Sequence, residues 1–133
     1  MAEITAAVRE KLAAPNFWLL GTVNPDGQAQ VNPMWVDIEG DNIVLNTSIG
    51  RRKEKNLRRD PRLTLAITDE DNPYEYVEIR GKVAEFIEGD EAEASIDSLA
   101  KKYIGEDVYP WRQEGERRVK LRIEPSYVNH WAP

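Results

Sequence analysis

The sequence predicts a mainly β protein of the α+β class, whose strands form one antiparallel barrel flanked by short helices. Roughly six or seven segments have the composition and alternation of strands. Most are separated by short turns rich in Gly, Pro, Asn and Asp, and the few helical patterns do not alternate regularly with them, as they would in a βαβ fold. The length of 133 residues suits one domain spanning residues 1–133.

The chain begins with a predicted short helix. Ile4, Val8 and Leu12 recur at every fourth position, which places them on one helical face. Pro15 ends this pattern, and the apolar residues 17–23 that follow predict the first strand.

Two hairpins are predicted next. Residues 24–27, Asn-Pro-Asp-Gly, are a turn signal, because proline presets the turn and glycine accepts a positive φ. Residues 28–38 alternate as one long strand, residues 39–42 form a second turn, and residues 43–47 return as a strand. The alternation places Ala29, Val31, Pro33 and Trp35 on one face, and Gln30, Asn32 and Met34 on the other.

The middle of the chain combines a basic helix with two strands. Residues 50–60 are polar and predict a short helix that ends before a proline. Residues 62–68 are a strand, and residues 69–73 are a loop of turn-forming residues. Residues 74–87 predict a long alternating strand, in which Gly81 marks a bulge or bend.

The clearest helix covers residues 90–104. Asp90 and Glu93 resemble a capping box, and Gly105 is suited to the C-terminal cap. The apolar stripe consists of Ala92, Ile96, Leu99, Ala100 and Tyr103.

The end of the chain is predicted to be an irregular loop followed by strands. The loop covers residues 106–116, one strand covers residues 117–123, and residues 125–131 add a last strand. The chain has no internal repeat and no low-complexity segment.

Composition excludes several function classes. A net charge of -6 argues against non-specific nucleic-acid binding, which needs a basic surface. The chain has no cysteine and a single histidine, so we expect no metal site, no disulfide and no thiol nucleophile. No signal peptide is recognisable, and no apolar run approaches the about 20 residues of a membrane helix. We therefore expect a cytoplasmic protein with no membrane partner.

A basic segment is the sharpest candidate site. Asn46, Thr47 and Ser48 end a predicted strand, and a glycine-led turn leads into the basic helix. Backbone N–H groups at a helix N-terminus bind anions, so Arg51 and Lys53 in the first turn would flank a phosphate, with Asn56 further along. The alternative is a solvated basic surface helix.

Residues 30–35 form a second candidate site. Pro33 has no N–H donor, so it belongs at a sheet edge or a bulge, and such an irregular edge leaves backbone amides and carbonyls free. A flat heterocycle with a pyrimidine-dione edge needs such donors and acceptors. The alternative is an ordinary edge strand that proline protects from further pairing.

Tyr74 and Tyr76 are a third candidate. They are predicted to share one strand face, where they would stack on a ring or line a substrate pocket across a dimer interface. Packing in the core or an interface is the alternative. His130, the single histidine, is expected to be structural or exposed, since the chain has no nucleophile elbow and no P-loop.

The order of these motifs resembles the pyridoxamine phosphate oxidase-like, flavin-binding split β-barrel superfamily. The similarity begins with Leu-Gly-Thr-Val at 20–23, Asn-Pro-Asp-Gly at 24–27 and Val-Asn-Pro-Met-Trp-Val at 31–36. Residues 51–62 and 72–81 are similar to the branch that uses the deazaflavin coenzyme F-420, and residues 96–105 and 119–125 continue the match. The resemblance covers residues 16–128.

The resemblance implies an antiparallel Greek-key split barrel and a homodimer with cofactor sites at the subunit interface. Arg51, Lys53 and Lys55 would meet the phosphate or acidic tail of the cofactor, with Asn46, Thr47, Ser48 and Asn56 beside them. Val31, Asn32, Pro33 and Met34 would flank the ring, largely through their backbone, and Tyr74 and Tyr76 would come from the partner subunit. No catalytic side chain is selected.

The implied function is that of an oxidoreductase that uses coenzyme F-420 to transfer hydride to or from a small electron-poor organic substrate. Two alternatives stay open: an FMN-dependent oxidoreductase of the same fold, and a non-catalytic flavin- or deazaflavin-binding protein. Because no constellation for pyridoxal phosphate is recognisable, oxidation of that vitamer is not expected.

Overall fold

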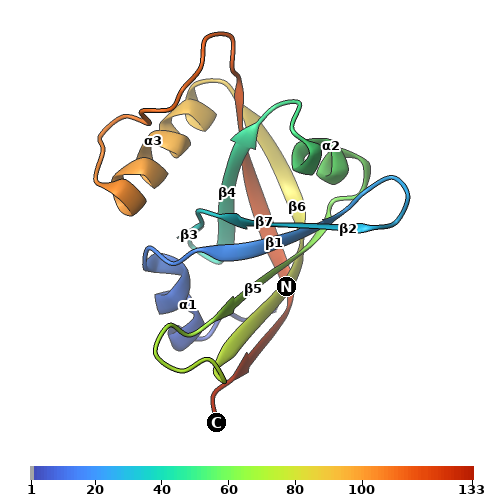
Figure 1. Cartoon of the computed structure of the whole chain (residues 1–133), viewed down its shortest axis with the longest axis vertical. Helices are drawn as coiled ribbons and strands as arrows, with labels where there is room; N and C mark the ends of the chain where they lie inside the picture. The colour runs from blue at the N-terminus through green and yellow to red at the C-terminus, as the bar shows by residue number, and fades with distance from the viewer. Residues whose placement is uncertain (1) are drawn as a thin grey trace.

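The computed structural model describes residues 2–133, which form one seven-stranded antiparallel sheet with three helices. The prediction of a mainly β, α+β fold is confirmed. Two helices lie on either side of the upper end of β4, and the third lies below (Figure 1). The elements are α1 (Ala6–Ala13), β1 (Trp18–Val23), β2 (Ala29–Met34), β3 (Asp37–Glu39), β4 (Asn42–Ser48), α2 (Arg52–Arg59), β5 (Arg62–Thr68), β6 (Tyr76–Glu88), α3 (Asp90–Ile104) and β7 (Arg118–Trp131).

The sheet closes on itself through a two-residue link. The strand order is β2-β1-β5-β6-β7-β4-β3, so β2 and β3 are its opposite edges, yet only Trp35 and Val36 separate them in sequence. A link this short spans at most about 11 Å, and the two edges must therefore approach each other. The sheet curls into a barrel that is split between β2 and β3.

The prediction of a single strand over residues 28–38 is wrong for this reason. Met34 ends β2 and Asp37 begins β3, which pairs with β4 at the other edge of the sheet. Side-chain alternation continues across the link and hides the break.

Helix α3 holds the link in place. The Tyr103 hydroxyl accepts a hydrogen bond from Val36 N at 3.0 Å and donates one to Asn16 O at 2.5 Å. The Lys102 ammonium donates to Val36 O at 2.6 Å and to Leu12 O at 2.7 Å. Burial lowers the pKa of Lys102, although Asp37 opposes the shift.

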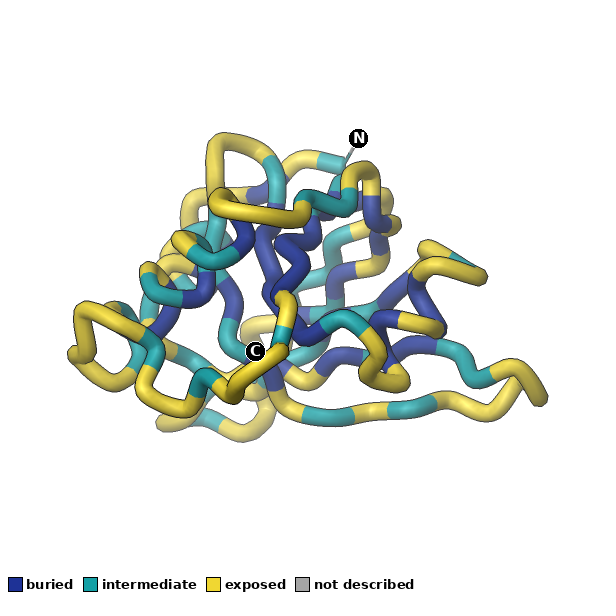
Figure 2. The backbone as a smooth tube through the Cα atoms, turned by 90° about the horizontal axis from the view of Figure 1, so that it is seen from above, coloured by how far each residue is buried: buried dark blue, intermediate teal, exposed yellow. Residues whose placement is uncertain are grey.

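Aliphatic side chains fill the barrel interior. The fully buried residues come from β1, β4, β5, β6 and β7 and from α1; they include Val8, Leu12, Leu20, Leu45, Leu65, Ile79, Leu121 and Ile123. Buried segments lie in the centre of the molecule and exposed loops surround them (Figure 2). Burial of each such side chain contributes about 1.5–3 kcal/mol. A filled interior leaves ligand binding to the outside of the barrel.

The long strands β6 and β7 bend where their pairing shifts. One register shift falls between Arg80 and Gly81, which confirms the predicted irregularity at this glycine. A Cβ atom on Gly81 would lie 2.6 Å from the backbone oxygen of Glu124. β7 continues through this region as one strand, where the sequence predicted two.

The ends of α3 match the sequence prediction, but its N-terminal cap does not. Gly89, with a φ of 78°, is the N-cap, and Asp90 is already the first helical residue. The Glu93 carboxylate binds Arg112 and the backbone N–H of Arg118 instead of closing a capping box. Gly105 is the predicted C-terminal cap, with a left-handed φ of 74°.

The start of β6 also differs from its prediction. Tyr74 lies in the turn before the strand, and Tyr76 is the first strand residue. The two tyrosines therefore do not share one strand face. In the part of the chain from residue 2 onward, no helix has the length and apolar character needed to cross a membrane.

We expect Gly81→Ala to lower the free energy of unfolding by about 1–3 kcal/mol, because the added methyl group overlaps the backbone of β7. Urea unfolding measures the change. Gly21→Ala is the matched control, since its Cβ would meet Thr64 O at 3.7 Å, an ordinary contact. Equal stability of the two variants would contradict the close approach at Gly81.

We expect Tyr103→Phe to lower the free energy of unfolding by about 1–3 kcal/mol, because the Val36 N–H loses its hydrogen-bond acceptor. Tyr127→Phe is the control, since the Tyr127 ring is 41% exposed and the Arg80 guanidinium that lies over it would remain. Thermal unfolding of both variants tests the expectation. A Tyr103→Phe protein as stable as the control would show that the Tyr103 hydroxyl does not stabilise the link.

Candidate functional site

The candidate site lies where β4 turns into α2. Gly50 makes the turn with a φ of 101°, and the N–H of Arg51 donates to Ser48 O at 3.3 Å. The Glu54 carboxylate accepts from Gly50 N at 2.8 Å and from Arg58 Nε at 2.8 Å. Burial would raise the pKa of Glu54, but these two donors hold it below its usual range. The first turn of α2 is thus held rigidly.

Lys53 is the central residue of this site. It is only 7% exposed, and its Nζ lies 3.4 Å from the Met34 sulfur. Within residues 2–133 no carboxylate forms an ion pair with it. Burial lowers its pKa, and the charges of Arg51 and Arg118 lower it further. A buried ammonium without a counter-ion is unfavourable, and a bound anion would relieve this cost.

A second unsatisfied group lies on β2. Asn32 Oδ1 is buried and has no hydrogen-bond partner within residues 2–133. Asn32 and Met34 are two positions apart on a strand, so they face the same side. The Lys53 ammonium and the Asn32 carbonyl oxygen therefore offer a donor and an acceptor on neighbouring parts of one surface.

The rest of β2 has the predicted character of an edge strand. β2 pairs only with β1, with Pro33 opposite Leu19 and Val31 opposite Gly21. Val31 is 58% exposed, and the other edge of the strand carries backbone groups free of sheet pairing. The position of Pro33 on an edge strand confirms the interpretation of this proline.

Arg118 is a buried cation that sequence reasoning missed. It is 5% exposed, and it donates to Asn46 Oδ1 at 2.9 Å, to Ser48 Oγ at 2.9 Å and to Glu116 Oε1 at 3.1 Å. Its guanidinium lies 5.1 Å from the centre of the Tyr109 ring. No local pattern signals this residue, because the register that pairs it with Ser48 is set by β4 and β7.

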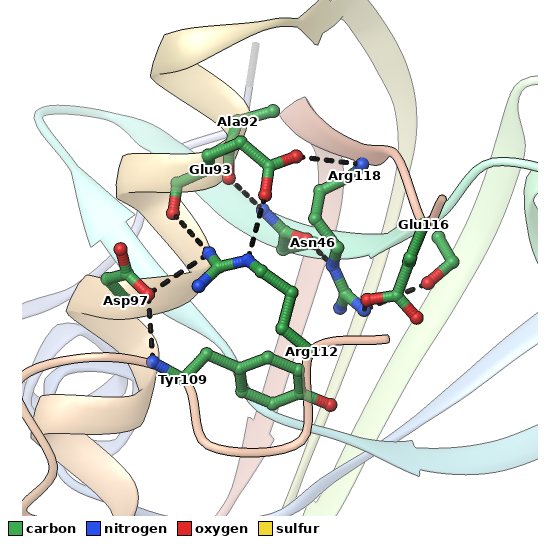
Figure 3. Close-up of polar contacts among 9 residues, drawn as sticks. Asn46, Ala92, Glu93, Asp97, Tyr109, Arg112, Glu116 and Arg118 are labelled. Carbon is green, nitrogen blue, oxygen red and sulfur yellow. Dashed lines mark hydrogen bonds and ion pairs between the residues drawn. The ribbon is translucent and has the colours of Figure 1, made fainter. Parts of the chain in front are cut away.

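Helix α3 and the loop of residues 106–116 form one wall beside Arg118 (Figure 3). Arg112 contacts Glu93 and Asp97, each at 3.1 Å. The same Asp97 oxygen accepts from Tyr109 N at 2.8 Å. These ion pairs hold the loop against the helix.

The wall is also joined to β4 and β7. The Asn46 amide donates to Ala92 O at 2.9 Å, and Glu93 accepts from Arg118 N at 3.1 Å (Figure 3). Asn46 and Ser48 are therefore buried parts of the site's scaffold, and Thr47 is buried between them.

Asn56 and Lys55 lie on the same helix as Lys53, but their surroundings differ from those of Lys53. Asn56 is fully buried, and its amide donates to Thr22 Oγ1 at 3.1 Å and to Asn24 Oδ1 at 2.9 Å. These bonds fasten α2 to the β1–β2 hairpin, so Asn56 orients the helix. Lys55 is exposed on the same helix, and Arg51 is exposed at the N-cap of this helix.

Tyr76 lies in a different region, beside an open cavity of about 830 Å³. The lining of this cavity combines apolar residues, among them Phe17, Leu19, Tyr76 and Val77, with polar and charged ones, among them Lys11 and Asp69. Its lining does not include Lys53 or Arg118. Tyr74 is 77% exposed in the turn before β6. Within one protomer, the two tyrosines are not brought to the basic segment.

A charged cluster lines part of this cavity. Lys11 contacts Asp69 at 2.8 Å and Glu75 at 3.2 Å, and Glu75 contacts His130 at 2.8 Å. His130 is half-buried at the end of β7 and is far along the sheet from Lys53. In the described residues, 2–133, no group of His, Cys, Asp or Glu side chains is arranged to hold a metal ion.

Comparisons with known proteins identify the family and the fold. The family profile described as pyridoxamine 5'-phosphate oxidase matches residues 4–132. A solved structure named F-420 reductase is 29% identical, with a TM-score of 0.83, and the match covers 95% of this chain and 98% of that one. A conserved hypothetical protein from Mycobacterium tuberculosis is 27% identical, with a TM-score of 0.79 and coverage of 98% and 85%.

More distant structures share the fold alone. A protein from Listeria innocua, named after pyridoxamine 5'-phosphate oxidase, is 19% identical with a TM-score of 0.69, and the match covers 93% of this chain and 92% of that one. No curated protein sequence matches the chain significantly. Since the profile spans nearly every residue and the split barrel recurs in these structures, the chain belongs to the pyridoxamine 5'-phosphate oxidase family.

Proposed function

We propose that this protein is an oxidoreductase that binds coenzyme F-420 at the start of α2 and acts on a small electron-poor organic substrate. The observation that carries the proposal is the buried Lys53 ammonium, which has a thioether as its one hydrogen-bond contact within residues 2–133. The family includes oxidoreductases with flavin-type cofactors, and a structure 29% identical to this chain is named F-420 reductase.

The anionic part of the cofactor fits the basic segment. Lys53 and Arg51 belong to the N-terminal turn of α2, where free backbone N–H groups and the helix dipole favour negative charge. Lys55 adds a further exposed cation on the same helix. A phosphate or carboxylate bound here would supply the counter-ion that Lys53 lacks.

The ring of the cofactor fits β2. A pyrimidine-dione edge presents N–H and C=O groups, and the exposed edge of Val31–Met34 presents their complements. Asn32 Oδ1 has no hydrogen-bond partner among residues 2–133 and would accept from a ring N–H. The two unsatisfied groups of the site thus match the two ends of such a cofactor.

A homodimer would bring the remaining predicted residues to the site. Leu19 and Val31 are about half exposed, at 49% and 58%, on neighbouring strands of the outer face. A second copy packed on this face would bury them and carry its own Tyr74 and Tyr76 toward the first copy's basic segment.

When bound in its reduced form, the coenzyme supplies hydride. Arg51, Lys53 and Lys55 bind its charge, β2 orients the ring, and the partner's tyrosines exclude water. Either those tyrosines or solvent returns the proton. FMN has the same kind of ring edge and a phosphate, and the family profile supports it as the second candidate.

We expect Lys53→Ala to weaken F-420 binding about 10- to 150-fold, the equivalent of about 1.5–3 kcal/mol for a charge-assisted hydrogen bond. Fluorescence titration of the purified protein with F-420, and separately with FMN, measures the affinity. Arg52→Ala is the matched control, because it removes the same charge from the adjacent exposed position. Equal losses in both variants, or tight binding of FMN without F-420, would contradict the assignment.

F-420 affinity should also depend on pH through Lys53. Its pKa lies below the ordinary lysine value of 10.5, mainly because the side chain is buried. As the pH rises through that lowered pKa, the ammonium loses its proton and anion affinity falls. In Lys53→Arg the guanidinium stays charged, so the affinity should change less between about pH 7 and pH 10. Identical pH profiles for both proteins would refute a role for the Lys53 charge.

A further inference from the structure

A cluster of charged side chains fixes the turn between β5 and β6, away from the basic segment. We call it the Lys11 cluster; its members come from α1, from the two ends of the turn and from β7, and they are Lys11, Asp69, Glu75 and His130. The Lys11 ammonium lies 2.8 Å from Asp69 Oδ1 and 3.2 Å from Glu75 Oε2. His130 Nε2 lies 2.8 Å from the same Glu75 oxygen. One lysine thus joins both ends of the turn to α1.

The turn is also closed by its own hydrogen bonds. Asp69 Oδ2 accepts from the N–H groups of Asp71 and Asn72, both at 3.1 Å. Asp69 N donates to Glu75 O at 2.8 Å, and Glu75 N donates to Asn72 O at 3.0 Å. One oxygen of the Asp69 carboxylate binds Lys11 while the other binds the turn. The ion pair and the backbone conformation of the turn therefore depend on each other.

The charged forms of the cluster stabilise one another. The hydrogen bond from Lys11 lowers the pKa of Asp69, and hydrogen bonds from His130 and Lys11 lower the pKa of Glu75. The hydrogen bonds to Asp69 and Glu75 raise the pKa of Lys11, although burial opposes this shift. Both carboxylates and the ammonium are therefore charged at neutral pH, and the cluster stays formed there.

Two tyrosines are positioned by this turn. Tyr74 and Tyr76 flank Glu75 in the sequence, and we call residues 69–76 the tyrosine turn. Tyr74 N donates to Asn72 Oδ1 at 3.1 Å, and Tyr74 is 77% exposed. Tyr76 is 40% exposed. An exposed aromatic residue on a fixed backbone can bind another surface at a low cost in conformational entropy.

Leu19 connects the tyrosine turn to the face on which the proposed second copy packs. It is 49% exposed on β1, and it lines the same cavity of about 830 Å³ as Lys11, Asp69 and Tyr76. A copy that packs on Leu19 therefore meets the tyrosine turn as well.

We infer that Lys11 is a positioning residue, which holds Tyr74 and Tyr76 where they contact the coenzyme bound by the second copy. This inference rests on the proposed function, which brings these tyrosines to the other copy's basic segment. Lys11 acts through Asp69 and Glu75, because its ammonium is paired with their carboxylates.

Amide hydrogen exchange, followed by NMR on the whole protein, tests the effect of Lys11 on the turn. We expect Lys11→Met to speed exchange of the Asp71 and Asn72 amides about two- to fivefold, the range for a partly exposed ion pair. Lys11→Arg keeps the charge and should restore slow exchange. The amides of β4 report global unfolding, so the ratio of turn exchange to β4 exchange isolates the local effect.

Arg9→Met is the matched control, because Arg9 lies on the same helix and pairs with Asp41 instead of the turn. It should leave the exchange of the turn amides unchanged. Turn exchange in Lys11→Met equal to that of this control would overturn the inference.

F-420 affinity, measured by fluorescence titration, tests the consequence for the coenzyme. We expect Tyr74→Ala and Tyr76→Ala each to weaken binding about two- to twelvefold, the range for one aromatic contact, and Lys11→Met to cause part of this loss. In a protein that carries both alanine substitutions, Lys11→Met should cause no further loss, because no tyrosine remains to be positioned. A loss of equal size with and without the tyrosines would overturn the inference.

The two measurements separate this inference from the proposed function. F-420 binding that is weakened in Lys53→Ala but unchanged in Lys11→Met would support the proposed function and overturn the inference. A wild-type protein without F-420 affinity would overturn the proposed function and the coenzyme contact inferred from it. Turn exchange that depends on Lys11 in that protein would still support the effect of Lys11 on the turn.

Discussion

Trp35 and Val36 join the two edges of the sheet, and the rest of the molecule is built around this short connection. Because it is too short to cross an open sheet of seven strands, the sheet has to curl until β2 and β3 approach each other. The Val36 N–H donates a hydrogen bond to the Tyr103 hydroxyl, and the Val36 carbonyl oxygen accepts one from Lys102. Both peptide groups of Val36 are therefore satisfied. The barrel is closed by covalent connectivity and by α3, since β2 and β3 do not pair.

The candidate site lies on this seam. Met34, the last residue of β2, contacts the Lys53 ammonium, and the ring of the next residue, Trp35, is stacked on Tyr103. Burying Lys53 opposes folding: its pKa is lowered in the folded state, so below that pKa the charged side chain decreases the free energy of unfolding. A positively charged group buried at such a cost, with no carboxylate of residues 2–133 paired with it, is consistent with a role in binding an anion.

The basic segment and Tyr76 lie in different regions of one protomer, and the homodimer that we propose would bring them together. Lys53 lies at one end of the barrel wall, whereas Tyr76 begins the far part of β6 and lines the large cavity. In the homodimer that we propose, a second copy would place its own Tyr76 beside Lys53. The half-exposed apolar side chains of β1 and β2 would provide the surface on which that copy packs.

The sequence by itself determined the helices and strands whose limits are marked by local residue patterns. The strand over residues 62–68 and the helix over residues 90–104 match the structure residue for residue, because composition, glycine and proline mark their limits. The basic helix and the edge position of Pro33 were predictable for the same reason. Only the tertiary structure decided the break at Trp35, the buried position of Arg118 and the structural bonds of Asn56. Alternation continues through a break, and the neighbours of a buried polar side chain depend on the register of strands distant in sequence, which no local pattern encodes.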